Sequence, residues 1–227
     1  ILLKANAFFS GIQISHARKG ELSISDANAA FRAFDKIADL PIFIEDVAGK
    51  TATDIRFLIQ EYKRRHGVGI VVVDYLQLIE SSIKTGRTRE NDVSGISRSL
   101  KITARLTGTA IICLSQLSRA VETRGGSKRP MLSDLRESGS IEQDADVVAF
   151  LYRPEYYGIM EDEEGNSLAG VTELIIAKNR NGALKTLKYK FVVTDFKEFG
   201  DEGEVQTTIY NPQIVRAPGQ DDEELPF

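Results

Sequence analysis

The carboxylate of Asp74 follows a predicted strand, at the end where parallel sheets bind their ligands. Asp74 directly follows Ile70–Val73, an apolar, β-branched run that predicts a central strand buried on both faces. Since ligands of parallel sheets bind at the carboxyl ends of the strands, Asp74 is a candidate to hold Mg²⁺ through its water shell in a nucleotide site. A solvent-facing aspartate at a strand end is the alternative that this pattern leaves open.

Polar groups at two further strand ends could act on the same nucleotide. Gln116 follows a predicted strand at 109–114, so its amide could face the terminal phosphate or the attacking water. Lys178 and Arg180 lie two residues apart beside a predicted turn and should project to one side of their strand. A guanidinium on a rigid hairpin can stabilise charge on a transferring phosphoryl group. A hydrogen-bonded glutamine and a solvated basic turn are the alternatives.

The segment 118–136 is a candidate for tracking a nucleic-acid backbone, because it holds five basic residues and two acidic ones. Its basic residues are Arg119, Arg124, Lys128, Arg129 and Arg136. A second basic stretch, with Lys84, Arg87 and Arg89, could line the same path, and a plain solvated loop explains it equally well. The chain has 29 basic and 33 acidic residues, and four of the acids lie in 221–227, so the remainder is neutral. Nucleic-acid contacts must therefore come from local patches.

Composition and cysteine content are those of an ordinary soluble domain, with 42% hydrophobic and 27% charged residues. No apolar run approaches the ~20 residues that cross a bilayer, and no secretory signal is visible, so we expect a cytoplasmic protein without a membrane partner. The single cysteine, Cys113, lies in an apolar run and is interpreted as a small buried residue. The chain begins with Ile1 and not Met, which suggests an internal fragment.

Alternating helices and strands must position these residues. Helices are predicted over most of 1–38 with breaks at Gly11 and Gly20, over 51–66 and over about 90–107. Strands are predicted at 41–46, 70–73, 109–114 and 147–152, and a β-hairpin at 171–178 and 184–193 around an Asn-Gly turn. This order predicts an α/β fold, with a mainly parallel sheet flanked by helices and a C-terminal hairpin. We expect one domain over 1–210 and a flexible acidic tail over 211–227.

Four segments resemble, in order, the motifs of the DnaB family of replicative DNA helicases. They are Asp74–Ile79, Leu114–Arg119, Asp134–Asp146 and Lys178–Gly182. The third is long and unusually specific, and the resemblance covers roughly residues 40–200. It implies a RecA-like motor domain that uses ATP and Mg²⁺ to translocate on single-stranded DNA and unwind the duplex.

The resemblance also implies roles for individual residues. Asp74 would be the Walker B aspartate, Gln116 would sense hydrolysis, and Lys178 and Arg180 would reach the nucleotide of a neighbouring subunit. Arg136, Glu137 and Gly139 would hold single-stranded DNA, with the basic residues Arg124, Lys128 and Arg129 beside them. A glycine at position 139 would allow close backbone approach to a phosphate. For the intact protein the family implies a homo-hexamer, an upstream domain that contacts primase, and a helicase loader.

A phosphate-binding loop is missing from the sequence. No Gly-x-x-x-x-Gly-Lys-Ser/Thr occurs, and Tyr75 rather than a carboxylate follows Asp74. In the DnaB family both the loop and the catalytic glutamate lie upstream of the part that residues 1–40 match, so we expect the chain alone to be inactive. Glu45, at a predicted strand end, is a disfavoured alternative base. His16 and His66 lack metal-ligand spacing.

Two other functions are weighed against the helicase. A RecA- or RadA-type recombinase shares the fold, but the third motif argues against it. A non-catalytic module would only bind DNA or a partner protein. The tail Asp221–Phe227 resembles the acidic tip of bacterial single-stranded-DNA-binding proteins, and it either docks replication partners or simply solvates the chain end and repels DNA.

Overall fold

The structure is a computed structural model that describes residues 2–81, 89–192, 195–199 and 205–206. Of residues 89–90, 136–139 and those beyond 190, only the backbone course is described. The basic residues Lys84 and Arg87 and the acidic tail at 211–227 lie outside the described residues.

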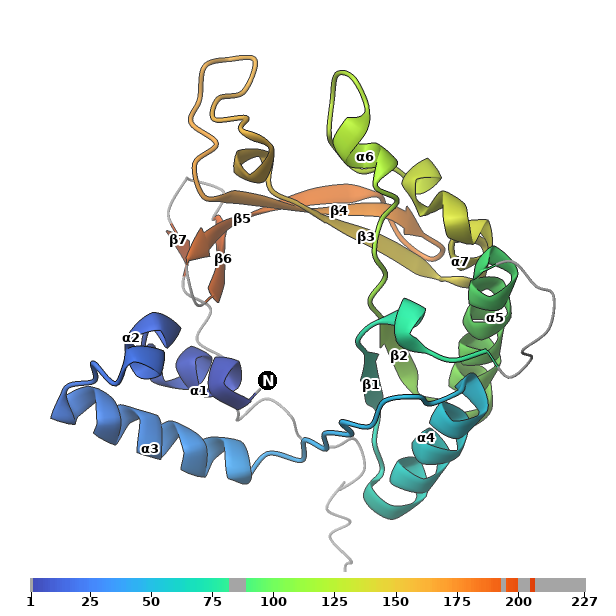
Figure 1. The fold of residues 1–227 in the computed structure, drawn as a ribbon, viewed down its shortest axis with the longest axis horizontal. Helices are drawn as coiled ribbons and strands as arrows, with labels where there is room; N and C mark the ends of the chain where they lie inside the picture. The colour runs from blue at the N-terminus through green and yellow to red at the C-terminus, as the bar shows by residue number, and fades with distance from the viewer. Residues whose placement is uncertain (1, 82–88, 193–194, 200–204, 207–227) are drawn as a thin grey trace, which may run out of the picture.

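The first 38 residues form three helices, as the sequence predicts. They are α1 (Leu2–Ser10), α2 (Ile14–Lys19) and α3 (Ile24–Ala38). Gly11 and Gly20 separate them with φ near 73°, a left-handed conformation that favours glycine. The Asn6 side chain donates a hydrogen bond to the Ala30 carbonyl at 2.8 Å and fixes α1 on α3. Figure 1 shows these helices apart from the strands at 70–73 and 110–113.

Helix α4 (Ala52–His66) agrees with the helix predicted over 51–66, and residues at both ends cap it. Thr51 Oγ1 accepts from the Asp54 amide at 3.2 Å, and the Asp54 carboxylate accepts from the Thr51 amide at 2.8 Å. Gly67, in the left-handed conformation, ends the helix. The helix packs against α5 (Arg89–Thr107) over an apolar cluster made of Ala52, Leu76, Val93, Ile96 and Leu100.

Strands β1 (Ile70–Val73) and β2 (Ala110–Cys113) pair in parallel, with α5 as the crossover between them. Ile111 and Cys113 pack against the cluster beneath α5. On the opposite face Ile70 and Val72 are 63% and 61% exposed, so the prediction of burial on both faces is wrong for this structure. Helix α5 packs on one face of β2. The described residues place no element over the other face.

The predicted strand at 41–46 is also wrong, since this segment has no regular secondary structure and is exposed. A strand needs backbone partners on a neighbouring strand, and none of the described residues pairs with 41–46. The segment instead lies along α4, where the Phe43 ring contacts those of Tyr62 and His66.

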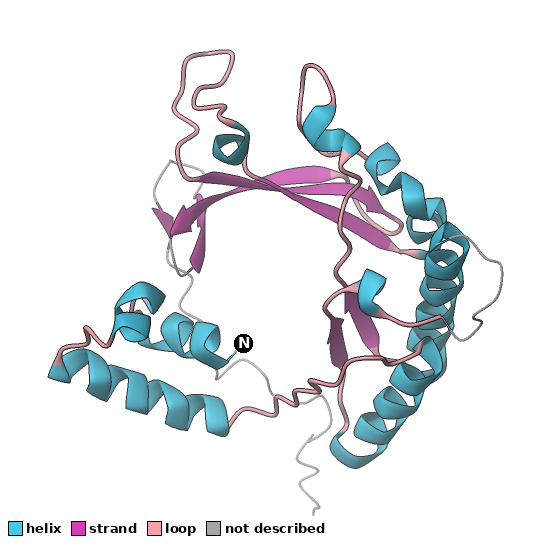
Figure 2. Ribbon diagram, viewed as in Figure 1, coloured by secondary structure: helices cyan, strands magenta, loops and turns pink. Residues whose placement is uncertain are grey.

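A second sheet is antiparallel and contains the predicted hairpin (Figure 2). Its strands, in spatial order, are β3 (Val147–Tyr152), β4 (Val171–Asn179), β5 (Lys185–Val192), β6 (Asp195–Phe199) and β7 (Val205–Gln206). Among the strands of the described ranges, only β1 and β2 pair in parallel, and one isolated bridge, between Thr51 and Glu80, is also parallel. Leu135, Val148 and Phe150 form the core beneath β3, with Ile175 and Ala177 of β4 packed against them. Helices beside a parallel pair and a C-terminal hairpin confirm the predicted α/β class.

The Thr51 cap gives a stability prediction. Thr51→Ala removes the acceptor for the Asp54 amide and should lower the free energy of unfolding by about 1 kcal/mol. Denaturant unfolding followed by circular dichroism measures this difference. Thr53→Ala, at an exposed position inside α4, is the control and should change it by less than about 0.5 kcal/mol. Equal effects of the two substitutions would contradict the capping role.

Candidate functional site

Asp74 and Gln116 lie at the same edge of the parallel pair. Asp74 comes one residue after β1, and Gln116 three residues after β2. Backbone hydrogen bonds of 2.9 Å, from Leu114 to Val73 and from Leu76 to Leu114, continue the pairing past the strand ends. The exposed Asp74 carboxylate has no hydrogen-bond or ion-pair partner among the described residues. It is therefore available to an incoming cation or its water shell.

Gln77 joins the two strand ends, a role that the sequence did not reveal. Its Nε2 donates to Ser115 Oγ at 3.0 Å and to the Gln116 carbonyl at 3.3 Å. Its Oε1 accepts from the Gln116 amide at 3.3 Å. Gln77 lies on a short 3-10 helix, η1 (Leu76–Leu78), directly after Asp74 and Tyr75. The only sequence signal was its place inside the first motif.

Lys178 and Arg180 both face the segment that leads into β3. Lys178 Nζ donates to the Glu142 carbonyl, and the Arg180 amide donates to the Asp146 carbonyl at 2.9 Å. The Arg180 guanidinium lies 3.4 Å from the Asp146 carboxylate and is 67% exposed. A register shift between Val148 and Ala149 inserts one extra residue in β4 just before Lys178. Sequence spacing could not show this bulge.

Asp146 is the second functional candidate that the sequence reasoning did not single out. Its carboxylate contacts Lys101 of α5 as well as Arg180. Hydrogen bonding to Lys101, and then to Arg180, holds the pKa of Asp146 below its usual range. The carboxylate is therefore ionised at neutral pH and orients the arginine by charge.

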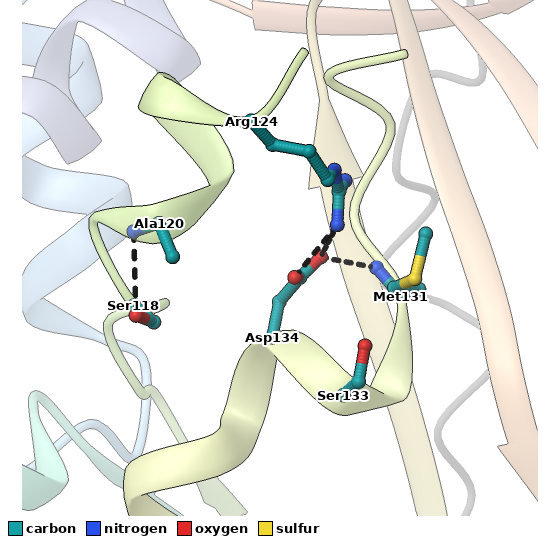
Figure 3. A pocket seen from close by; sticks show the side chains of 6 residues that line it. All are labelled: Ser118, Ala120, Arg124, Met131, Ser133 and Asp134. Carbon is teal, nitrogen blue, oxygen red and sulfur yellow. Dashed lines mark hydrogen bonds and ion pairs between the residues drawn. The ribbon is translucent and has the colours of Figure 1, made fainter. Parts of the chain in front are cut away.

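Arg124 organises the basic loop from within (Figure 3). Its Nη1 lies 2.8 and 3.2 Å from the two carboxylate oxygens of Asp134, whose side chain is only 8% exposed. The same carboxylate accepts from the Met131 amide at 2.8 Å. These residues line a pocket of about 450 Å³ together with Ser118, Ala120 and Ser133. The Arg124 guanidinium thus links two parts of the same basic loop.

Lys128 and Arg129 are engaged inside the protein as well. Lys128 Nζ donates to the carbonyls of Glu122 and Arg124. The Arg129 guanidinium pairs with Glu173 of β4 and donates to Thr186 Oγ1 of β5 at 3.0 Å. These contacts give the three cations structural roles, and their contact with DNA stays a prediction.

The remaining predicted DNA residues lie on one short helical stretch. Arg136 and Glu137 belong to η2 (Leu132–Ser138), and Gly139 begins α7 (Gly139–Asp144). The side chains of Arg136 and Glu137, like that of Arg89 at the start of α5, are outside the described part of the structure. Their DNA contacts also stay predictions.

Two other reactive groups, the Cys113 thiol and the Glu45 carboxylate, are set by their immediate surroundings in the fold. Burial raises the pKa of the half-buried Cys113 thiol to about 12, which keeps it protonated. Glu45 accepts a hydrogen bond of 2.6 Å from the Tyr62 hydroxyl, and this bond raises the pKa of Tyr62. The described residues contain no cluster of three or more acidic, His or Cys side chains suited to a metal. None of their helices has the length and apolarity needed to cross a bilayer.

Comparisons with known proteins agree on one family. Residues 2–201 match the family model of the DnaB-like helicase C terminal domain. The chain is 45% identical over 181 residues to the replicative DNA helicase DnaB of Geobacillus stearothermophilus, and equally similar to the replicative DNA helicase DnaC of Bacillus subtilis (strain 168). Each match covers 80% of this chain but only 38% of the relative.

Solved structures show the same likeness. A DnaB-like replicative helicase, described with its interactions with primase, superposes with a TM-score of 0.77 at 37% identity, over 86% of this chain and 46% of that one. A second solved structure, described as an ATPase domain, superposes with a TM-score of 0.77 at 38% identity, over 86% of this chain and 68% of that one. These two superpositions confirm the RecA-like fold that the motifs imply.

The buried ion pair in the basic loop gives a prediction. Arg124→Ala leaves the Asp134 carboxylate buried without its cation and should lower the free energy of unfolding by about 3 kcal/mol. Arg119→Ala removes an exposed charge from the same segment and should change it by less than about 0.5 kcal/mol. Urea titrations of the two variants against the parent chain measure the difference. If Arg124→Ala is as stable as Arg119→Ala, the pair does not hold the loop.

Proposed function

Because the chain belongs to the family of DnaB-like helicase C-terminal domains, we propose that it powers a replicative helicase by hydrolysing ATP at the replication fork. Hydrolysis would drive translocation along single-stranded DNA and unwinding of the duplex. The observation that carries this proposal is the pairing of Asp74 and Gln116 at one edge of β1 and β2, fixed by Gln77. The family match does not favour the recombinase alternative.

The residues at this edge fit a magnesium nucleotide. The Asp74 carboxylate is exposed and has no partner among the residues described, so it can accept hydrogen bonds from the water shell of Mg²⁺. Bound Mg²⁺ would neutralise charge on the phosphates. Gln77 holds the Gln116 backbone, so the Gln116 side chain can contact the terminal phosphate or orient water beside it. The sequence contains no Gly-x-x-x-x-Gly-Lys loop, so the cradle for the phosphates must come from other residues.

Arg180 is proposed to act on the nucleotide of a neighbouring subunit. Its guanidinium is two-thirds exposed and pairs with Asp146 at 3.4 Å on the surface. Exposed pairs of this kind contribute little free energy, so a phosphate group can displace Asp146 from the arginine. Lys178, which is half-buried and donates to the Glu142 carbonyl, is proposed to support the same contact.

Partners are proposed from the family and from the basic loop. Single-stranded DNA would contact Arg136, Glu137 and Gly139 along η2 and α7. One structural neighbour is a DnaB-like helicase that was described with primase, and we propose primase, a helicase loader and a homo-hexameric assembly for the intact protein. The acidic tail at 221–227 remains a proposed docking segment for replication partners.

One prediction from this function concerns ATP hydrolysis. The 227-residue chain should show no ATP turnover, because no phosphate-binding loop is present in its sequence. In a protein extended upstream to supply this loop, Asp74→Asn should lower kcat about a hundredfold or more. Asp39→Asn, at the end of α3, is the control and should leave kcat unchanged. Turnover by the short chain that Asp74→Asn abolishes would show that the site is misplaced.

Another prediction from this function concerns Arg180. In the assembled protein Arg180→Ala should reduce hydrolysis about a thousandfold and leave nucleotide binding intact, since the missing charge acts on the transferring phosphoryl group. Mixing it with the Asp74→Asn variant should restore part of the activity, because some interfaces then combine two intact halves. Lys185→Ala, at the other end of the same hairpin loop, should keep full activity. Mixed assemblies that exchange subunits and remain inactive would exclude action across the interface.

A further inference from the structure

The predicted DNA-binding loop and the hairpin that carries Arg180 are joined by an ion pair whose carboxylate is buried. Arg129 leaves the loop and places its guanidinium against the Glu173 carboxylate of β4 and Thr186 Oγ1 of β5. The Glu173 side chain is 10% exposed. A carboxylate buried this deeply needs a permanent cation, so the contact persists while the surface around it changes.

Hydrogen bonds connect this pair back to the helical stretch that holds the predicted DNA residues. The Arg129 carbonyl accepts from Arg124 Nη2 at 2.8 Å, and Arg124 is paired with Asp134. Asp134 lies on η2, two residues before Arg136. Direct contacts thus run from η2 through Asp134 and Arg124 to Arg129, and a displacement of η2 would be transmitted along them.

On the other side, the pair acts on a rigid element. Glu173 and Thr186 lie on adjacent strands, since Glu173 is paired with Lys188 and Ile175 with Thr186. Strand β4 continues from Glu173 to Asn179, and Arg180 follows directly. Ile175 and Ala177 pack against the apolar cluster that contains Leu135 of η2, so apolar contacts support the same connection. Apolar contacts have no preferred direction. The ion pair of Arg129 with Glu173, in contrast, fixes the position at which the loop contacts the hairpin.

We propose that the bridge of Arg129 with Glu173 and Thr186 couples DNA binding at the loop to the position of Arg180, and so sets how strongly DNA stimulates hydrolysis. Glu173 and Thr186 are positioning residues in this role, since they touch neither ligand. The inference rests on the proposed function, because it needs an ATPase that responds to DNA.

The test measures ATPase rates of the assembled full-length protein with and without saturating single-stranded DNA. Glu173→Gln should lower the ratio of the two rates about 3- to 10-fold, with the rate without DNA and the affinity for DNA unchanged. Thr186→Val removes only the acceptor at an exposed position and should lower the ratio in the same direction by a smaller factor. It keeps the test valid if Glu173→Gln folds poorly. Glu61→Gln, in a surface ion pair on α4, is the matched control and should leave the ratio unchanged.

A double-mutant cycle decides whether the residues act through each other. Arg129→Ala combined with Glu173→Gln should lower the ratio no further than Arg129→Ala alone. A parent protein without DNA-stimulated hydrolysis would reject the proposed function itself. If the parent is stimulated but both Glu173→Gln and Thr186→Val keep the full ratio, the coupling role is wrong. A parallel loss of both rates, with the ratio preserved, would show a merely structural role and would also overturn the inference.

Discussion

Two buried carboxylates determine how the basic loop is built. Asp134 and Glu173 are each about nine-tenths buried, and a buried charge is tolerated only when it is paired. Their cations are Arg124 and Arg129, so much of the positive charge that the sequence shows in 118–136 is neutralised internally. The loop therefore has a shape that its own ion pairs define, and the pair of Arg124 with Asp134 holds η2 in it.

Features set by local chemistry were predictable from the sequence. The Thr51 cap and Gly67 fixed the limits of α4, and glycines separated α1, α2 and α3, because capping bonds and left-handed φ depend on single residues. The hairpin followed from two alternating runs and an Asn-Gly turn. The edge shared by Asp74 and Gln116 followed from strand order, since consecutive parallel strands end on the same side.

Features set by distant partners were not predictable. The run at 41–46 has the composition of a strand, but a strand forms only beside another backbone. In the same way, Arg129 is indistinguishable by type from a cation that faces DNA. Its partners Glu173 and Thr186 lie 44 and 57 positions away in the chain, and charge patterns carry no sign of such pairing. Gln77 and Asp146 were overlooked for the same reason.

Arg129 and Arg180 differ in how deeply their carboxylate partners are buried. Arg129 pairs with the Glu173 carboxylate, which is shielded from water. Breaking this contact would therefore cost much free energy. Arg180 pairs at the surface with Asp146, and water or a phosphate can take that place at little cost. The lowered pKa of Asp146, held down first by Lys101, keeps this competitor charged at neutral pH. In the role proposed for Arg180, its release would therefore follow from the arrival of a stronger anion, such as a phosphate, and not from protonation of Asp146 at neutral pH.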